Sequence, residues 1–189
     1  KIMKFKVLLI SVLTLFLVQC KKKVQTKENH SENKEVQKRA KFEPKEGVLL
    51  FVGQELEAVG GLQAYNDGYL DHFDKPAGWT TYTSINPGDT SFGFIHKGLD
   101  GLWETNDWGD HHYNAKMQLQ SPSYTNMALA IGLSFVNHEE KVAEGTHDVF
   151  IEKLADFLLS LGKRPVFLRI AYEFEGHPWN HYDRESTLA

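Results

Sequence analysis

The sequence predicts an α/β fold, and in particular the first part of a (β/α)₈ TIM barrel. Predicted strands near residues 48–52, 80–84, 128–136 and 166–172 alternate with segments of helical character, the order expected of a parallel sheet with right-handed crossovers. The chain has 189 residues, whereas a complete barrel takes about 250. We therefore expect roughly the first four β/α units of a barrel, with adjacent parallel strands in chain order.

Each strand is recognised by its composition and by the break that ends it. The first is a short apolar run closed by Gly53, and the second is rich in threonine and aromatic residues. Trp79, at the start of the second strand, is expected to pack in the core. The last two strands read ALAIGLSFV and VFLRIAY. Such near-continuous apolar runs are typical of strands buried on both faces of a parallel sheet.

The clearest helix lies directly before the last strand. Its apolar residues recur at helical spacing: Phe150, Leu154, Phe157, Leu158 and Leu161. Thr146 or Asp148 is available to cap its start, and Gly162 to stop it. Weaker helical signals fall between Gly61 and Phe73 and around 117–127. The polar, glycine-rich segment 86–113 is a long loop, and such loops in compact domains are usually functional.

Composition excludes some function classes. The net charge is −4 and the pI is about 6.1, so the chain has no basic footprint for nucleic acid, and an acidic polymer is a disfavoured ligand. Cys20 is the only cysteine, which rules out an intrachain disulfide. We expect no cofactor and a monomer.

The first 20 residues predict export. Lysines precede an apolar stretch, 7–18, that is too short to span a bilayer, as in a secretory signal peptide. The stretch ends at Cys20 in a pattern resembling a bacterial lipobox, although Gln19 replaces the usual small residue. Residues 21–46 follow as a polar tether. We expect a protein of the cell envelope held in the membrane by a lipid on Cys20; the alternative is an ordinary signal peptide and a secreted protein.

Two carboxylates follow the last strand. Glu173 and Glu175 stand where a parallel barrel strand delivers its catalytic groups, and a carboxyl group there is the usual general acid of a glycosidase. Being two residues apart, they would point to the same side. Catalytic pairs come from different strands, so we expect one to be catalytic and the other to orient the substrate. The alternative is a pair of solvated carboxylates.

Aromatic residues surround these carboxylates. Trp179, His181 and Tyr182 follow at once, and the loop residues Trp103 and Trp108 belong to the same face. Sugars bind to aromatic faces supplemented by a few directed polar groups. Four further loop residues, Asp107, Asp110, His111 and His112, lack a recognised metal-ligand spacing, so no metal site is predicted.

Several motifs resemble one enzyme family in their order along residues 47–183. They are LFVGQ with AVGG, PAG with TTYTS, DWG, AIGL and LRIAYEF. Together they resemble the endo-1,3-β-xylanases of glycoside hydrolase family 26. The resemblance implies that Glu173 is the acid/base and that the nucleophile is a glutamate beyond residue 189. Mannanases of the family carry histidine where this chain has Tyr172, which favours the xylanase branch.

We therefore predict a retaining endo-glycosidase acting on a β-1,3-xylan-like polysaccharide, of which this 189-residue chain alone is inactive and poorly folded. The candidate substrate-binding residues are Gln54, Trp103, Trp108, Tyr172, Glu175, Trp179, His181 and Tyr182. Two alternatives remain. One is a mannanase or other β-glycanase, and the other is a non-catalytic polysaccharide-binding lipoprotein.

Overall fold

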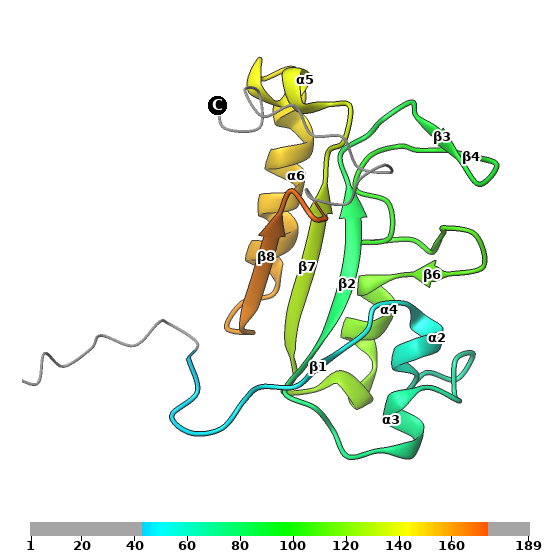
Figure 1. Cartoon of the computed structure of the whole chain (residues 1–189), viewed down its shortest axis with the longest axis vertical. Coiled ribbons are helices and arrows are strands. Elements are labelled where there is room, and N and C mark those ends of the chain that lie inside the picture. Colours follow the sequence, from blue (N-terminus) through cyan, green and yellow to red (C-terminus); the bar gives the residue numbers. More distant parts are fainter. Residues whose placement is uncertain (1–42, 174–189) are drawn as a thin grey trace, which may run out of the picture. The chain divides into compact units, whose positions relative to one another are not determined.

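The structure, a computed structural model, describes residues 43–173. It is a mixed α/β fold around a parallel four-stranded sheet in the order β1-β2-β7-β8 (Figure 1). The strands are β1 (Phe51–Val52), β2 (Gly78–Ser84), β7 (Ala128–Ser134) and β8 (Val166–Ile170). The predicted order and direction of the strands are confirmed. The leader and Cys20 lie outside the described residues. Of the predicted tether, 21–46, only residues 43–46 are described.

The strand ends differ from those predicted. β1 keeps only Phe51 and Val52 of the run 48–52, because Val48, Leu49 and Leu50 are exposed and precede its pairing with β2. β7 and β8 end at Ser134 and Ile170. β7 is buried along its whole length, as predicted. The prediction of burial on both faces is wrong for β8, which has a pairing partner only on its β7 side within the described residues.

The predicted helix before β8 is present as α6 (Asp148–Ser160). It lies behind β7 and β8 in Figure 1 and places Leu154 and Phe157 in the core. Neither predicted residue caps it. His147 occupies the cap position without a side-chain hydrogen bond, and the Thr146 hydroxyl donates instead to the Lys141 carbonyl.

Short elements fill the connections. They are α2 (Leu56–Val59), α3 (Tyr69–His72), α4 (Ala115–Gln120), the 3₁₀ turn η1 (Pro122–Tyr124) and α5 (Glu139–Ala143). Two small hairpins lie between β2 and α4, at the carboxyl end of β2. One pairs β3 (Thr90–Ser91) with β4 (Phe94–Ile95), and the other pairs β5 (Asn106–Asp107) with β6 (His112–Tyr113). Both belong to the segment 86–113 that the sequence marks as functional.

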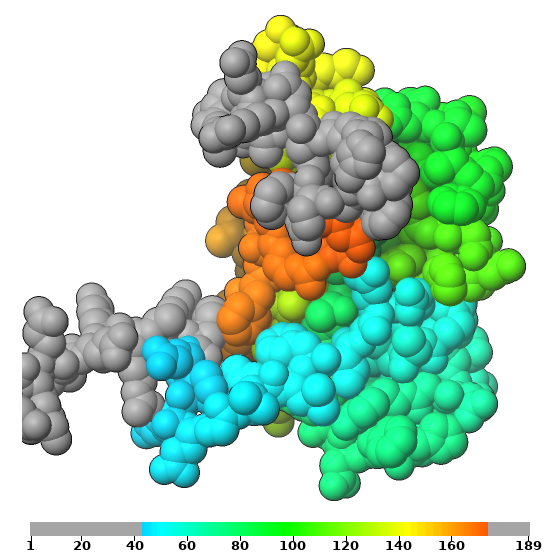
Figure 2. All heavy atoms as spheres, viewed as in Figure 1, coloured from blue at the N-terminus to red at the C-terminus, as the bar shows by residue number. Residues whose placement is uncertain are grey.

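The core lies between the sheet and its helices. Trp79, Leu129 and Ile131 project from β2 and β7 to pack with Leu154 and Phe157, and Trp79 is fully buried as predicted. The other face of the sheet is lined by rings over small residues. Phe51 and Phe167 come from the two edge strands and touch edge to face, with ring centroids 5.4 Å apart. In the space-filling view, the segment leading into β1 (cyan) and β8 (orange) both reach the surface (Figure 2).

Candidate active site

A pocket of about 390 Å³ opens at the carboxyl ends of the parallel strands. Its lining comes from β2, from the turn after β8, and from the segments that follow β1 and β2: Gln54, Tyr82, Phe92, Trp108, Tyr113, Tyr172 and Glu173. Loops at this edge of parallel strands carry the catalytic groups of α/β enzymes. The pocket therefore lies where the sequence places the chemistry.

Tyr82 of β2 is the centre of the aromatic lining. Its ring lies 5.2 Å from that of Tyr172, 5.5 Å from that of Trp108 and 6.1 Å from that of Tyr113. The alternation of β2 explains this position. Thr81 and Thr83 are buried, so the side chain of Tyr82 between them lies on the opposite face of the sheet.

Tyr172 is held from two directions. The Gln54 amide donates a hydrogen bond of 3.1 Å to the Tyr172 hydroxyl, and the guanidinium of Arg169 lies 4.5 Å from the ring centroid. Below the ring is Gly132 of β7. A Cβ at position 132 would lie 2.9 Å from the Tyr172 ring, too close for any side chain to fit. The tyrosine thus rests directly on the sheet.

Glu173 is the only carboxylate that lines this pocket among the described residues. It is exposed and follows β8 in a turn, not in the strand itself. Ala171 and Glu173 both have positive φ, 57° and 55°, a region that residues other than glycine seldom occupy. Such outliers cluster at functional sites, where the surrounding structure holds them in place.

Trp108 is fixed at the pocket wall by its neighbours. Its ring stacks on buried His96 at 4.4 Å and 17°, and Phe92 meets it edge-on at 6.3 Å. The backbone N–H of Trp108 also closes a tight turn by donating to the His111 carbonyl. An aromatic ring held this firmly loses little conformational entropy when a ligand packs on it.

A polar cluster lies beside the pocket, where β6 meets α2. His112 contacts the Glu57 carboxylate through its ring and through its backbone N–H. Burial alone would raise the pKa of Glu57, but the hydrogen bonds from His112 outweigh it and lower that pKa. Asp107 lies 3.9 Å from the same histidine ring. Among residues 43–173 no group of three or more acidic, histidine or cysteine side chains is arranged to hold a metal ion.

Of the predicted site residues, the structure brings Gln54, Trp108, Tyr172 and Glu173 into one pocket. Trp103 does not join them. It packs edge-on against Phe157 of α6, with ring centroids 5.4 Å apart. Glu175, Trp179, His181 and Tyr182 lie outside the described residues.

Sequence reasoning missed Tyr82, Phe92 and Tyr113. The usable signal for Tyr82 was its place near the carboxyl end of a strand, on the face opposite Trp79 and the core. Phe92 and Tyr113 lie in short hairpins that have no periodic signature. Tyr113 is buried and its hydroxyl donates to Glu55 at 3.4 Å. Burial, followed by the charge of Glu55, raises its pKa, so the phenol stays protonated.

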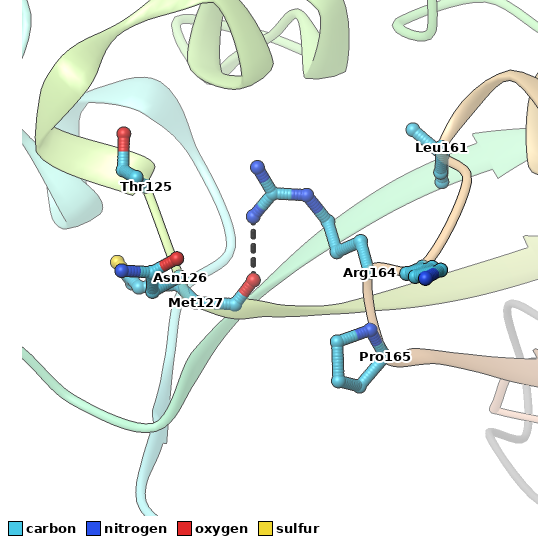
Figure 3. Close-up of a pocket in the computed structure, with 7 residues that line it drawn as sticks. Thr125, Asn126, Met127, Leu161, Arg164 and Pro165 are labelled. Atoms are coloured by element: carbon cyan, nitrogen blue, oxygen red, sulfur yellow. Dashed lines mark hydrogen bonds between the residues drawn. The ribbon is translucent and has the colours of Figure 1, made fainter.

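A second hollow, of about 430 Å³, lies at the opposite, amino-terminal edge of the sheet (Figure 3). There Arg164 donates to the carbonyls of Tyr124 and Met127, and its guanidinium lies over the Trp79 ring at 5.3 Å. Burial lowers its pKa. Among the described residues, no carboxylate or histidine lines this hollow, and its arginine already binds the backbone.

Comparison with known proteins gives the pocket a context. A β-1,3-xylanase from an Alcaligenes species is 35% identical over 145 residues, which cover 77% of this chain and 26% of that protein. The β-1,3-xylanase TXYA of a Vibrio species is 33% identical over 147 residues, which cover 77% and 27%. The sequence is xylanase-like. No family model matches the chain.

The chain spans about a quarter of the length of these curated relatives. Their identity to this chain supports a glycoside hydrolase relationship. Within residues 43–173, no helix is long and apolar enough to cross a membrane.

Proposed function

We propose that this chain carries the acid/base half of a retaining endo-glycoside hydrolase of family 26, acting on β-1,3-linked xylan. The observation that carries the proposal is the position of Glu173, at the carboxyl edge of a parallel sheet and in a pocket walled by aromatic rings. The relatedness to two β-1,3-xylanases supports the substrate class. The activity belongs to a protein that includes this chain, because the relatives are much longer.

The fold supporting this site is proposed to be part of a (β/α)₈ barrel. Strands β1 and β8 are separated by two others, and strands in a sheet lie about 4.8 Å apart. Phe51 and Phe167 nevertheless meet at 5.4 Å. Rings from strands about 14 Å apart in a flat sheet meet most readily when the sheet curves toward the face that carries them. Curvature toward one face, with helices on the other, favours a barrel over a flat sheet.

In the proposed mechanism, Glu173 acts as general acid and donates a proton to the glycosidic oxygen as the bond to the sugar breaks. A second carboxylate attacks the anomeric carbon and forms a glycosyl-enzyme intermediate. Glu173, now ionised, removes a proton from water, which hydrolyses the intermediate. Retaining enzymes hold the two carboxyl groups about 5–5.5 Å apart, and among the described residues Glu173 is the only carboxylate of this pocket. We propose that the nucleophile is supplied by sequence beyond this chain.

The aromatic lining suits a xylose unit. Pentose rings present C–H faces to aromatic side chains and need few polar partners for orientation. Tyr172 supplies a ring immediately before Glu173, and its hydroxyl is already oriented by Gln54. We assign Tyr82, Trp108 and Tyr172 to binding of the xylose unit whose anomeric carbon is attacked.

The test uses the protein at its natural length. Glu173→Ala should lower kcat on β-1,3-xylan about 10²- to 10⁴-fold, the usual contribution of general acid–base catalysis. The loss should shrink on an aryl glycoside with a good leaving group, and added azide should partly restore turnover by attacking the intermediate.

Glu175→Ala is the matched control, expected to act mainly through KM. Azide rescue of Glu175→Ala and not of Glu173→Ala would reverse the assignment. If the unchanged protein hydrolyses no β-glycan, the proposed function is wrong.

A further inference from the structure

A third cavity, of about 230 Å³, adjoins the aromatic pocket, and Tyr82 and Trp108 line both spaces. It lies at the carboxyl ends of β2 and β7, under the β3–β4 hairpin. Its chemistry differs from that of the aromatic pocket, because its lining is mainly polar: Ser84, Asn86, Asp89, Ser91, His96 and Ser134.

We propose that this polar cavity binds the sugar unit next to the one held in the aromatic pocket, and that Asp89 is the residue that selects it. The inference rests on the proposed function.

Asp89 is held by a chain of two buried histidines. Its Oδ1 lies 3.1 Å from Nε2 of His138, and Nδ1 of His138 lies 2.8 Å from Nε2 of His147. His138 is 3% exposed and His147 8%. A carboxylate only accepts hydrogen bonds, so Nε2 of His138 carries the proton. Burying two imidazoles is costly unless they are paired. Here His147 pairs with His138, and His138 in turn orients the Asp89 carboxylate at the cavity wall.

The carboxylate keeps the capacity to bind a ligand. The Asp89 side chain is 44% exposed, and among the described residues only His138 is hydrogen-bonded to it. Its Oδ2 can therefore accept from a sugar hydroxyl. A carboxylate accepts with both oxygens, a pattern suited to the neighbouring hydroxyls of a sugar.

Donors stand on the same wall. The backbone N–H of Asp89 bonds to the Asn86 carbonyl at 3.2 Å, which brings the two side chains to one turn. Asn86 uses its side-chain oxygen to accept from the Ser84 hydroxyl at 2.6 Å, so its amide N–H groups remain to donate to a ligand. Ser91 is fixed on His96, with 2.5 Å between Oγ and Nε2. Acceptor and donor groups thus face one cavity from positions fixed by the protein.

The test compares substrate lengths in the natural-length protein, using β-1,3-xylo-oligosaccharides of increasing length. Asp89→Asn keeps an oxygen for His138 but replaces the second acceptor with a donor. The kcat/KM should fall about 10- to 100-fold on the longer substrates, the value of a hydrogen bond to a charged group. It should be unchanged on an aryl β-xyloside, because the single sugar of that substrate fills the aromatic pocket alone.

Thr90→Trp provides a second variant. Thr90 is exposed and lines the cavity, so the larger side chain blocks it from the rim without disturbing the core. It should abolish the gain in kcat/KM that the unchanged protein shows with length. Asp156→Asn, an exposed aspartate of α6, is the matched control and should leave all lengths unaffected.

A loss of equal size at every length, or no loss in either cavity variant, would overturn the inference while leaving the proposed function standing. An unchanged protein that cleaves no oligosaccharide would instead overturn the proposed function, and the inference with it.

Discussion

Three buried residues of the core, Trp79, Gln118 and Tyr124, are joined by hydrogen bonds. The indole N–H of Trp79 donates to Gln118 at 3.0 Å, Gln118 donates to the Tyr124 hydroxyl at 3.3 Å, and that hydroxyl donates to the Gly60 carbonyl at 2.6 Å. Burial raises the pKa of Tyr124 to about 12, so it donates at any physiological pH. The sequence indicated that Trp79 is buried. It could not indicate Gln118 or Tyr124, because their pairing depends on contacts far apart in the chain.

The histidine pair predicts how stability depends on pH. Burial, and then the neighbouring His138, lower the pKa of His147 below its usual 6.5. The unfolded chain therefore takes up a proton before the folded one, and the free energy of unfolding should fall as the pH drops from 7.5 through 6.5 toward 5. Urea unfolding of the natural-length protein at these pH values measures the fall.

His147→Asn should show a smaller fall over the same range, because it removes the titrating group. Glu57, whose pKa is also lowered, titrates only below its usual 4.5, so it does not contribute above pH 5. An identical fall in both proteins would contradict the assignment to His147.

At the scale of elements, periodicity predicted α6 and could not predict the strand ends. Phe150, Leu154 and Phe157 recur on one helical face whatever surrounds them, so the helix is recognisable from local sequence. A strand ends where its pairing with the neighbouring strand ends, and the strand's own sequence does not determine that position. Val48 and Leu49 look like strand residues but have no pairing partner.

Two leucines of α6 provide a matched test of its packing. Leu154 is 4% exposed and Leu159 is 77% exposed. Leu154→Ala should lower the free energy of unfolding by about 2–5 kcal/mol, the range for a buried leucine that leaves a cavity. Leu159→Ala should change it by less than about 0.5 kcal/mol, as at most surface positions. Urea denaturation of both variants gives the comparison, and equal losses would show that α6 packs by a different face.

At the scale of the molecule, the described sheet has two open edges and one face lined by exposed or half-buried rings. β1 and β8 each pair on one side only within residues 43–173, and Leu49, Leu50 and Ile170 are exposed beside them. Unpaired edges and exposed apolar residues favour association between chains. The sequence predicted the strand order because βαβ connections leave few topologies. The pocket was predicted only in part, since Tyr82, Phe92 and Tyr113 are brought together by tertiary structure.

The chain of 189 residues, expressed without further sequence, should therefore self-associate and hydrolyse no β-1,3-xylan. Light scattering measures the first property and reducing-sugar release the second. Leu50→Lys, a charge placed beside β1, should reduce the association without restoring activity. Measurable hydrolysis by this chain would mean that a second catalytic carboxylate lies within it, against the proposed division of the site.

Gly132 and Tyr172 impose a constraint on each other. The ring occupies the space where any side chain on β7 would begin, with 2.9 Å to a Cβ at position 132. A larger residue at 132 has to displace the aromatic ring beside Glu173, and a smaller residue at 172 leaves a gap over bare backbone. We therefore expect substitutions at positions 132 and 172 to be coupled, so that a change at either position requires a compensating change at the other.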